Sequence, residues 1–160
     1  MSVLVFTVAQ NGYSVAFSQC LAAQRAYAKK FGFDYVAVNR PWRVPVPALS
    51  AWLKIPLIEQ ALERGYEWVA FIDSDARPQP STPDFRSVAR EGKSVFMANG
   101  RSERLNSGVI FVRNDPASRA YFADLMGSLS EVIPEEERAH LKFENGNVIH
   151  CAKRTNTIEV

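Results

Sequence analysis

Short apolar runs alternate along the chain with longer segments in which apolar residues recur every three or four positions. The runs are rich in β-branched and aromatic residues, which is typical of buried strands. They predict strands at residues 2–8, 33–38, 67–72, 95–98 and 109–112.

The first segment of helical spacing lies between the first two predicted strands. Its apolar stripe runs from Tyr13 to Phe31, with polar residues between the apolar positions. Asn11 and Gly12 form a turn signal before it, and Gly32 occupies a typical position just past a helix end. The pattern predicts one continuous helix between these two signals.

A proline-rich loop, "NRPWRVPVPALS", separates the second strand from the next helix and cannot be a central strand. Ser50 is a candidate N-cap for that helix. Pro56 either kinks the helix or marks its true first turn. Gly65 is expected to end it.

The last helical segment covers residues 115–129, with Asp115 as cap and Pro116 at the first helical position. The alternation of strands and helices predicts a single α/β domain over residues 1–160, built on a parallel sheet with right-handed crossovers. Ligands of such sheets bind outside the carboxyl ends of the strands.

Composition agrees with one globular domain. The chain has 160 residues, of which 47% are hydrophobic and 22% charged. A formal charge of +2 is too small to indicate nucleic-acid binding, although arginine, which suits phosphate, supplies most of the basic residues.

The chain has no Cys-x-x-Cys pair of the kind that binds zinc, so Cys20 and Cys151 are expected to be free, buried thiols.

No segment approaches the ~20 apolar residues of a membrane span, and the first residues lack the basic start of a signal peptide. A cytoplasmic location is therefore the expectation. The same features are compatible with a domain of a longer, membrane-tethered protein.

Asp73 and Asp75 stand where the apolar run Trp68–Ile72 stops, in "EWVAFIDSDARPQP". In an extended segment residues i and i+2 point to one side, so the two carboxylates would repel unless a cation lay between them. Mg²⁺ and Mn²⁺ are oxygen-seeking ions held by one or two carboxylates plus substrate phosphates. An ordinary turn is the alternative, and the position at the end of a buried strand favours the metal.

Two further stretches carry candidate binding groups. In "RLNSGVIFVRN", Asn106, Ser107 and Gly108 precede an apolar strand and could bind sugar hydroxyls, or could form a plain turn. Lys54 lies among apolar residues near a helix start, where its ammonium group either reaches a phosphate or extends to water.

The stretch "KFENGNVIHCA" is the fourth candidate. Glu144 and Asn145 either face the site from a loop or cap a helix that runs through Val148 and Ile149. His150 is a candidate third metal ligand because imidazole accepts Mn²⁺.

The stretches "YAKKFGFDYVAVN", "WLKIPLIEQAL", "YEWVAFIDSDA" and "LNSGVIFVRN" occur in this order in the chain. Together they resemble the GT-A fold glycosyltransferases, especially the galactosyl/mannosyl/xylosyl transferase group that includes fungal α-mannosyltransferases and plant xyloglucan xylosyltransferases. The resemblance covers roughly residues 2–115, with a weaker similarity around 140–150. The Asp-x-Asp alone is loosely specific, and the ordered set of four is considerably more specific.

The resemblance implies a nucleoside diphosphate sugar donor, UDP- or GDP-linked, a glycan or other hydroxyl acceptor, and a divalent metal, usually Mn²⁺ or else Mg²⁺. It assigns metal contacts to Asp73 and Asp75, with Asp73 also near the ribose. The remaining assignments place Thr7, Gln10 and Tyr13 at the nucleobase and ribose, Lys54 near the donor, Asn106 and Ser107 near the transferred sugar, and Glu144 at the reacting centre. These transferases mostly retain the anomeric configuration, so a dedicated base is not required.

Family members continue well past this chain's length and usually bring a late histidine to the metal. Two alternatives therefore stay open. One is a non-catalytic or truncated domain of the same fold that binds nucleotide sugars without turnover. The other, less favoured, is a phosphohydrolase with Asp73 as nucleophile, although such enzymes carry Asp-x-Asp-Gly-Thr on the first strand.

Overall fold

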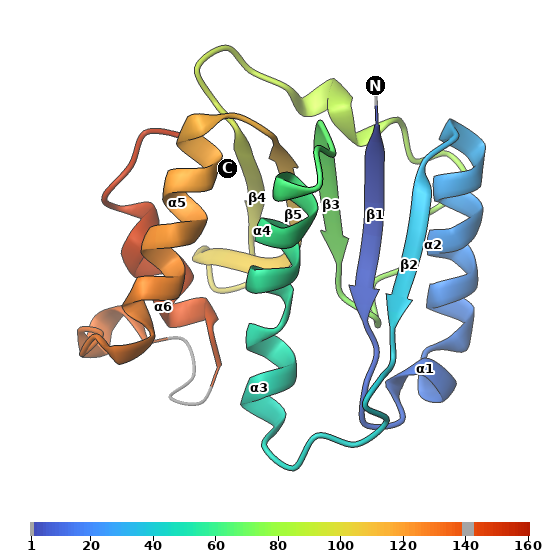
Figure 1. Cartoon of the computed structure of the whole chain (residues 1–160), viewed down its shortest axis with the longest axis horizontal. Coiled ribbons are helices and arrows are strands. Elements are labelled where there is room, and N and C mark those ends of the chain that lie inside the picture. Colours follow the sequence, from blue (N-terminus) through green and yellow to red (C-terminus); the bar gives the residue numbers. More distant parts are fainter. Residues whose placement is uncertain (1, 139–142) are drawn as a thin grey trace.

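The computed structural model describes residues 2–138 and 143–160, so His140 and part of the 140–150 similarity lie outside the described residues. A six-stranded sheet in the order β2-β1-β3-β5-β4-β6 forms its centre, with helices against both faces (Figure 1). The strands are β1 (Val3–Val8), β2 (Asp34–Val38), β3 (Trp68–Ile72), β4 (Val95–Asn99), β5 (Leu105–Arg113) and β6 (Ile158–Glu159). The helices are α1 (Tyr13–Ala16), α2 (Ser18–Phe31), α3 (Pro47–Trp52), α4 (Lys54–Glu63), α5 (Pro116–Gly127) and α6 (Asn145–Ala152), with short 3-10 turns at η1 (Phe85–Val88), η2 (Ser128–Ser130) and η3 (Glu135–Glu137).

The predicted α/β class with a mostly parallel sheet is confirmed. β1 pairs in parallel with β2 and β3, and β4 with β6. Among the described strands, only β5 runs antiparallel to its neighbours, β3 and β4. The start of β5 therefore meets the carboxyl end of β3, and this brings two separately predicted motifs to the same edge of the sheet.

Alternating side chains of the strands build a core on each face of the sheet. Leu4 and Phe6 of β1 pack on the face covered by α4, α5 and α6, whereas Val3 and Val5 pack on the face of α2 and η1. Figure 1 shows α4 in front of the sheet, with α5 beside it. Both faces of β3 are buried, which explains why its sequence is an unbroken apolar run.

All five predicted strands form. Two elements differ from the prediction: the start of β5, and the first helix, which is divided in two. β5 begins at Leu105, so Asn106-Ser107-Gly108 lies inside the strand and does not precede it. The first helical stripe is divided at Phe17, whose φ of −111° separates α1 from α2. Gly32 ends α2 in the left-handed conformation, as predicted.

The prediction of Ser50 as an N-cap is wrong. Ser50 lies within α3, and Val46 precedes that helix without a side-chain cap. A separate helix, α4, begins at Lys54, so Pro56 stands in its first turn, where a missing N–H costs little. Of the two possibilities for Pro56, the first turn is therefore confirmed.

No helix among residues 2–138 and 143–160 is both long enough and apolar enough to cross a membrane.

Asp115 caps α5 as predicted, and Pro116 is at the first helical position. The Asp115 carboxylate accepts hydrogen bonds of 2.9 Å from the N–H groups of Ala117 and Ser118, and another from the hydroxyl of Ser94 beside β4.

We expect Asp115→Ala to lower the free energy of unfolding in urea by about 1–2 kcal/mol, because the helix N–H groups lose their acceptor. Asp124→Ala, on the exposed side of α5, is the control and should cost less than about 1 kcal/mol. Equal losses for the two variants would contradict the capping role.

Candidate functional site

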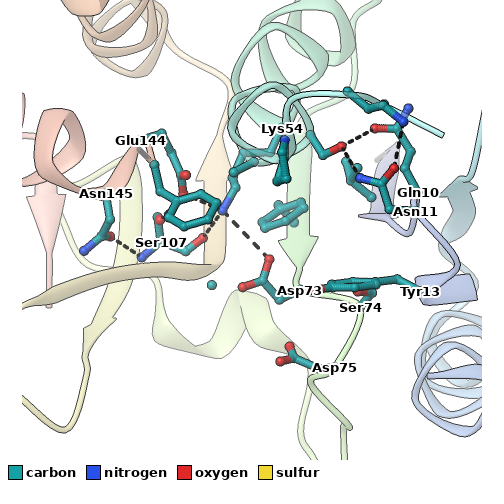
Figure 2. A pocket seen from close by; sticks show the side chains of 18 of the residues that line it. Gln10, Asn11, Tyr13, Lys54, Asp73, Ser74, Asp75, Ser107, Glu144 and Asn145 are labelled. Atoms are coloured by element: carbon teal, nitrogen blue, oxygen red, sulfur yellow. Dashed lines mark hydrogen bonds and ion pairs between the residues drawn. The ribbon is translucent and has the colours of Figure 1, made fainter. Parts of the chain in front are cut away.

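A cavity of about 510 Å³ opens at the carboxyl end of β1 and β3 (Figure 2). Five chain segments contribute to it: the exit of β1, the loop and α3 with the first residue of α4, the end of β3, the first half of β5, and the start of α6. The lining residues are Val8, Gln10, Asn11, Tyr13, Val44, Pro47, Ser50, Ala51, Lys54, Phe71, Asp73, Ser74, Asp75, Asn106, Ser107, Gly108, Phe143, Glu144 and Asn145.

Asp73 follows the last residue of β3 and is fixed by the antiparallel partner strand. Its N–H donates to the carbonyl of Gly108 at 2.8 Å. A Cβ on Gly108 would lie only 2.8 Å from Oδ2 of Asp73 and 2.8 Å from Oδ1 of Asn106. A side chain at position 108 would therefore displace the Asp73 carboxylate, which gives a physical reason for glycine in this strand.

A buried ion pair closes one wall of the cavity. Nζ of Lys54 lies 2.8 Å from Oε1 of Glu144 and donates to the carbonyl of Ser107 at 3.1 Å. The Ser107 hydroxyl donates to the same carboxylate oxygen at 2.6 Å. Lys54 and Glu144 are each only 4% exposed, so their charges are compensated by one another and not by water.

Lys54 also faces Asp73, but more loosely. Nζ lies 3.8 Å from Oδ1 of Asp73 and 4.6 Å from the centre of the Phe71 ring. Burial raises the pKa of Asp73 to about 6, with Lys54 opposing the rise and the charges of Asp75 and Glu144 adding to it. The Asp73 side chain is nevertheless 45% exposed, so it lies at the surface of the cavity and is accessible to a ligand.

The geometric premise for the aspartate pair is wrong, because the segment is not extended. The N–H of Ala76 donates to the carbonyl of Asp73 at 2.9 Å and closes a turn. In Figure 2 Asp73 points toward Lys54, whereas Asp75 lies beyond the turn, farther from Lys54. Asp75 is exposed and still lines the same cavity.

Asn106 and Asn145 lie on either side of Ser107. Oδ1 of Asn106 accepts from the N–H of Gly108 at 2.8 Å, and Asn106 itself is exposed to the cavity. Asn145 accepts from the N–H of Ser107 at 2.9 Å and donates to the carbonyl of Leu105 at 3.0 Å. Glu144 stands just before α6, but its side chain makes no capping hydrogen bond and instead contacts Lys54 and Ser107 at the cavity.

The opposite wall is held by Gln10 and Asn11 at the exit of β1. Gln10 donates to the carbonyls of Arg40 and Pro41 at 3.1 and 3.3 Å, and its Oε1 accepts from Ser50 at 2.9 Å. Asn11 accepts from the N–H of Val44 at 2.7 Å. Gln10 is 3% exposed, so its amide supports the loop more than it offers a surface to a ligand.

Tyr13 differs from its neighbours because it is 52% exposed. It stands at the start of α1 on the rim of the cavity, with its ring edge-on to Phe17 at 5.2 Å. An exposed, supported aromatic ring beside a polar cavity is suited to stack on a planar group.

All the residues nominated from the sequence line the cavity except Thr7 and His150. Thr7 is fully buried within β1. His150 lies on α6, where Nδ1 contacts Glu137 and Nε2 contacts Arg154. The structure therefore does not bring the predicted third ligand to the aspartate pair.

Sequence reasoning missed Ser50, Phe143 and Ser74 as lining residues, and used Asn11 only as a turn signal. Ser50 reaches the cavity wall through its hydrogen bond to the distant Gln10, whereas Ser74 lies between the two nominated aspartates and could have been nominated with them. Asn11 carried one usable signal, since an asparagine before glycine often adopts a positive φ, and here its φ is 56°.

The aspartate pair fits a hard divalent cation, although it does not form a complete site. Within residues 2–138 and 143–160, no group of three or more His, Cys, Asp and Glu side chains is arranged to hold a metal ion. A pair of carboxylates is nonetheless the usual protein share for Mg²⁺ or Mn²⁺ when phosphates supply the other ligands. Burial is the largest cause of the raised pKa of Asp73, and the charges of Asp75 and Glu144 add to it, so a cation bound here would favour the ionised carboxylate.

No protein-family model matches the chain, and no curated protein matches it either. Solved structures do match. A glycosyltransferase involved in the glycosylation of the major capsid of PBCV-1 is similar with a TM-score of 0.74 at 14% identity, over 100% of this chain and 82% of that one. The apo-form glycosyltransferase GlyE of Streptococcus pneumoniae TIGR4 is similar with a TM-score of 0.60 at 12% identity, over 100% of this chain and 45% of GlyE.

These likenesses identify the fold as that of GT-A-like glycosyltransferases. At such low identity they concern the fold alone, and the narrower resemblance to the mannosyl and xylosyl transferase group stays a prediction.

The buried pair predicts a specific pattern of stability. Lys54→Met and Glu144→Gln should each lower the free energy of unfolding by about 3–5 kcal/mol, because each leaves a buried partner uncompensated. The double variant should recover much of that loss, which urea unfolding of all four proteins would measure. Additive losses in the double variant would show that the two side chains act independently.

The raised pKa of Asp73 predicts the pH dependence of its replacement. At a pH above the folded pKa of about 6, the buried negative charge of Asp73 lowers the free energy of unfolding. At a pH below the ordinary pKa of 3.8, Asp73 is protonated in both states and this loss disappears. Asp73→Asn should therefore raise the melting temperature at pH 7.5, and this gain should shrink as the pH falls from 6 to 4.

Asp75→Asn is the matched control for this measurement, because Asp75 is exposed and its removal should change the melting temperature less. A gain for Asp73→Asn that stayed constant from pH 7.5 to pH 4 would rule out burial of a charge as the cause.

Proposed function

We propose that the chain is a metal-dependent glycosyltransferase that moves a hexosyl or pentosyl group from a UDP- or GDP-linked sugar to a glycan or other hydroxyl acceptor. The observation that carries the proposal is the charge of the cavity. Its described lining includes Asp73, Asp75 and Glu144 but only one cationic residue, Lys54, which already pairs with Glu144. A diphosphate would be repelled by this surface unless a divalent cation lay between.

Asp73 and Asp75 would hold Mn²⁺ or Mg²⁺ together with the diphosphate oxygens. Bound there, the ion would supply the positive charge that stabilises a departing diphosphate. The fold supports this location, because ligands of open α/β sheets bind at the carboxyl ends of the strands.

The other lining residues divide between holding the donor and shaping the site. Tyr13, with its exposed ring, would stack on the nucleobase. Gln10 would hold the wall behind the nucleoside, since its amide is already bonded to the loop. Thr7, buried in β1, would support the same wall from within the sheet.

At the other end of the cavity, Asn106 would donate from Nδ2 to the transferred sugar, since its Oδ1 is occupied by Gly108. Ser107 and Lys54 would form the surface beneath that sugar. Glu144 would hold both of them in place, because one of its oxygens contacts both side chains. The exposed Arg77 and the proline-rich loop are candidates for acceptor contacts.

The state of Glu144 favours transfer with retention of configuration. Among the described lining residues it is the one carboxylate outside the aspartate pair, and its Oε1 is engaged by Lys54 and Ser107. A carboxylate held in this way is poorly placed to act as a general base on an acceptor hydroxyl. Retaining transferases do not require such a base.

A domain that binds nucleotide sugars without transferring them is the alternative. The same compensation of Lys54 by Glu144 supports it, because few charged side chains of the cavity are left for chemistry.

Removal of Asp75 tests the metal assignment. In calorimetric titrations with UDP and GDP, the wild-type chain should bind one of them in the presence of MnCl₂ and lose that binding in EDTA. Asp75→Asn should lose the Mn²⁺-dependent binding and keep its fold, because the side chain is exposed. The control Glu91→Gln removes an exposed carboxylate outside the cavity and should bind as the wild type does. Full Mn²⁺-dependent affinity in Asp75→Asn would show that the metal is not held here.

A panel of UDP- and GDP-sugars with Mn²⁺ separates the two functions. The transferase should release the nucleoside diphosphate slowly from one donor even without acceptor, because water can replace the hydroxyl. Binding of a donor with neither hydrolysis nor transfer across the panel would favour the binding domain.

A further inference from the structure

The segment that carries the aspartate pair leaves the sheet after the hydrogen bond from Asp73 N–H to the carbonyl of Gly108 in β5. From Asp73 to Asp84 it runs through turns and irregular backbone until η1 begins. A segment of this kind must satisfy its carbonyl groups by other means. Four side chains of α2 donate to its carbonyl oxygens: Cys20 to Asp75, Gln24 to Asp73 and Ala76, Tyr27 to Pro83, and Lys30 to Pro80 and Thr82.

Gln24 makes the contacts that matter for the aspartate turn. Its Nε2 donates at 2.9 Å to the carbonyl of Asp73 and at 2.9 Å to the carbonyl of Ala76. These two residues are the first and last of the turn, whose own hydrogen bond joins Ala76 N–H to the Asp73 carbonyl. One amide group therefore clamps both ends of the turn that presents Asp73 and Asp75.

The orientation of this amide is determined by its surroundings. Gln24 is fully buried, so no water competes for its hydrogen bonds. Its Oε1 accepts from the hydroxyl of Tyr35 at 3.3 Å. If the amide were reversed, its oxygen would face two carbonyl oxygens, which cannot donate. Both N–H groups are thus committed to the turn.

A buried glutamine at this place has no packing reason. The other buried residues of α2 are Tyr27 and Ala28, and the helix face turned to the sheet is otherwise apolar or small. A polar group in such a place is costly unless it is fully hydrogen-bonded, and Gln24 is bonded to the one segment that carries the candidate metal ligands.

We propose that Gln24 is a positioning residue for the aspartate pair: by holding the carbonyls of Asp73 and Ala76 it sets the direction of both carboxylates, and so the affinity of the site for a divalent cation and its nucleotide. This inference rests on the proposed function for its ligand, and on the hydrogen bonds alone for the clamp. Partners outside the direct ligands typically affect metal affinity by about 10- to 100-fold.

The decisive comparison is Gln24→Met, which has similar length but no donor, with Tyr27→Phe. The Tyr27 hydroxyl, on the same helix, donates to the carbonyl of Pro83 near the end of the segment and accepts from the N–H of Phe85 in η1. Affinity for MnCl₂ with UDP or GDP is measured by calorimetry. Exchange of the Ala76 amide hydrogen is measured by NMR without any ligand. Gln24→Asn, which keeps the amide but shortens its reach, is the second variant in case Gln24→Met does not fold.

We expect Gln24→Met to weaken Mn²⁺-dependent nucleotide binding by roughly 10- to 100-fold and to speed exchange at Ala76 by roughly 3- to 10-fold, as expected for the loss of a hydrogen bond. Tyr27→Phe should lower the melting temperature yet leave both quantities within about twofold of the wild type. A merely structural role of Gln24 would instead change the melting temperature in both variants and leave the affinity unchanged.

Wild-type affinity or unchanged Ala76 exchange in a folded Gln24 variant would overturn the proposal. Absence of Mn²⁺-dependent binding in the wild type would instead refute the proposed function. In that case exchange at Ala76 alone decides whether Gln24 fixes the turn.

Discussion

The antiparallel pairing of β3 with β5 brings Ile72 opposite Val109 and joins Asp73 to the carbonyl of Gly108, and the rest of the site depends on this contact. Because β5 runs against the other described strands, its first residues lie beside the end of β3 and not at the far edge of the sheet. Ser107 then reaches Lys54 and Glu144, which join α4 and α6 to the same strand. A parallel β5 would have placed these groups apart.

The charges at this edge explain why a cation is central to the proposed chemistry. The buried pair of Lys54 and Glu144 compensates itself, so the aspartates are left with little positive charge nearby. Burial is the largest cause of the raised pKa of Asp73, and Lys54, 3.8 Å away, opposes that rise without cancelling it. A site in this state favours ligands that bring positive charge with them, and a metal-bound diphosphate is such a ligand.

Local sequence signals were sufficient for much of the fold. Apolar runs located the strands, and Gly32 and Asp115 located helix ends, because those features depend on neighbouring residues. The direction of β5 and the place of Ser50 depend on contacts between distant segments, and single-residue preferences do not contain them. The same limit applies to the site. The sequence pattern nominated the aspartates, Lys54 and Glu144, but it did not predict their mutual contacts. His150 contacts Glu137 and Arg154, and the sequence pattern predicted neither contact.

The loop at residues 40–44, beside Gln10 and Asn11, is held through its main-chain atoms. Gln10 and Asn11 bind the carbonyls of Arg40, Pro41 and Trp42 and the N–H of Val44, so these bonds do not use the side chains of Arg40, Trp42 and Val44. Substitutions at Arg40, Trp42 and Val44 therefore leave these hydrogen bonds in place. Evolution, or a directed library restricted to these positions, has access here to a surface that can diversify while the scaffold beneath it stays constant.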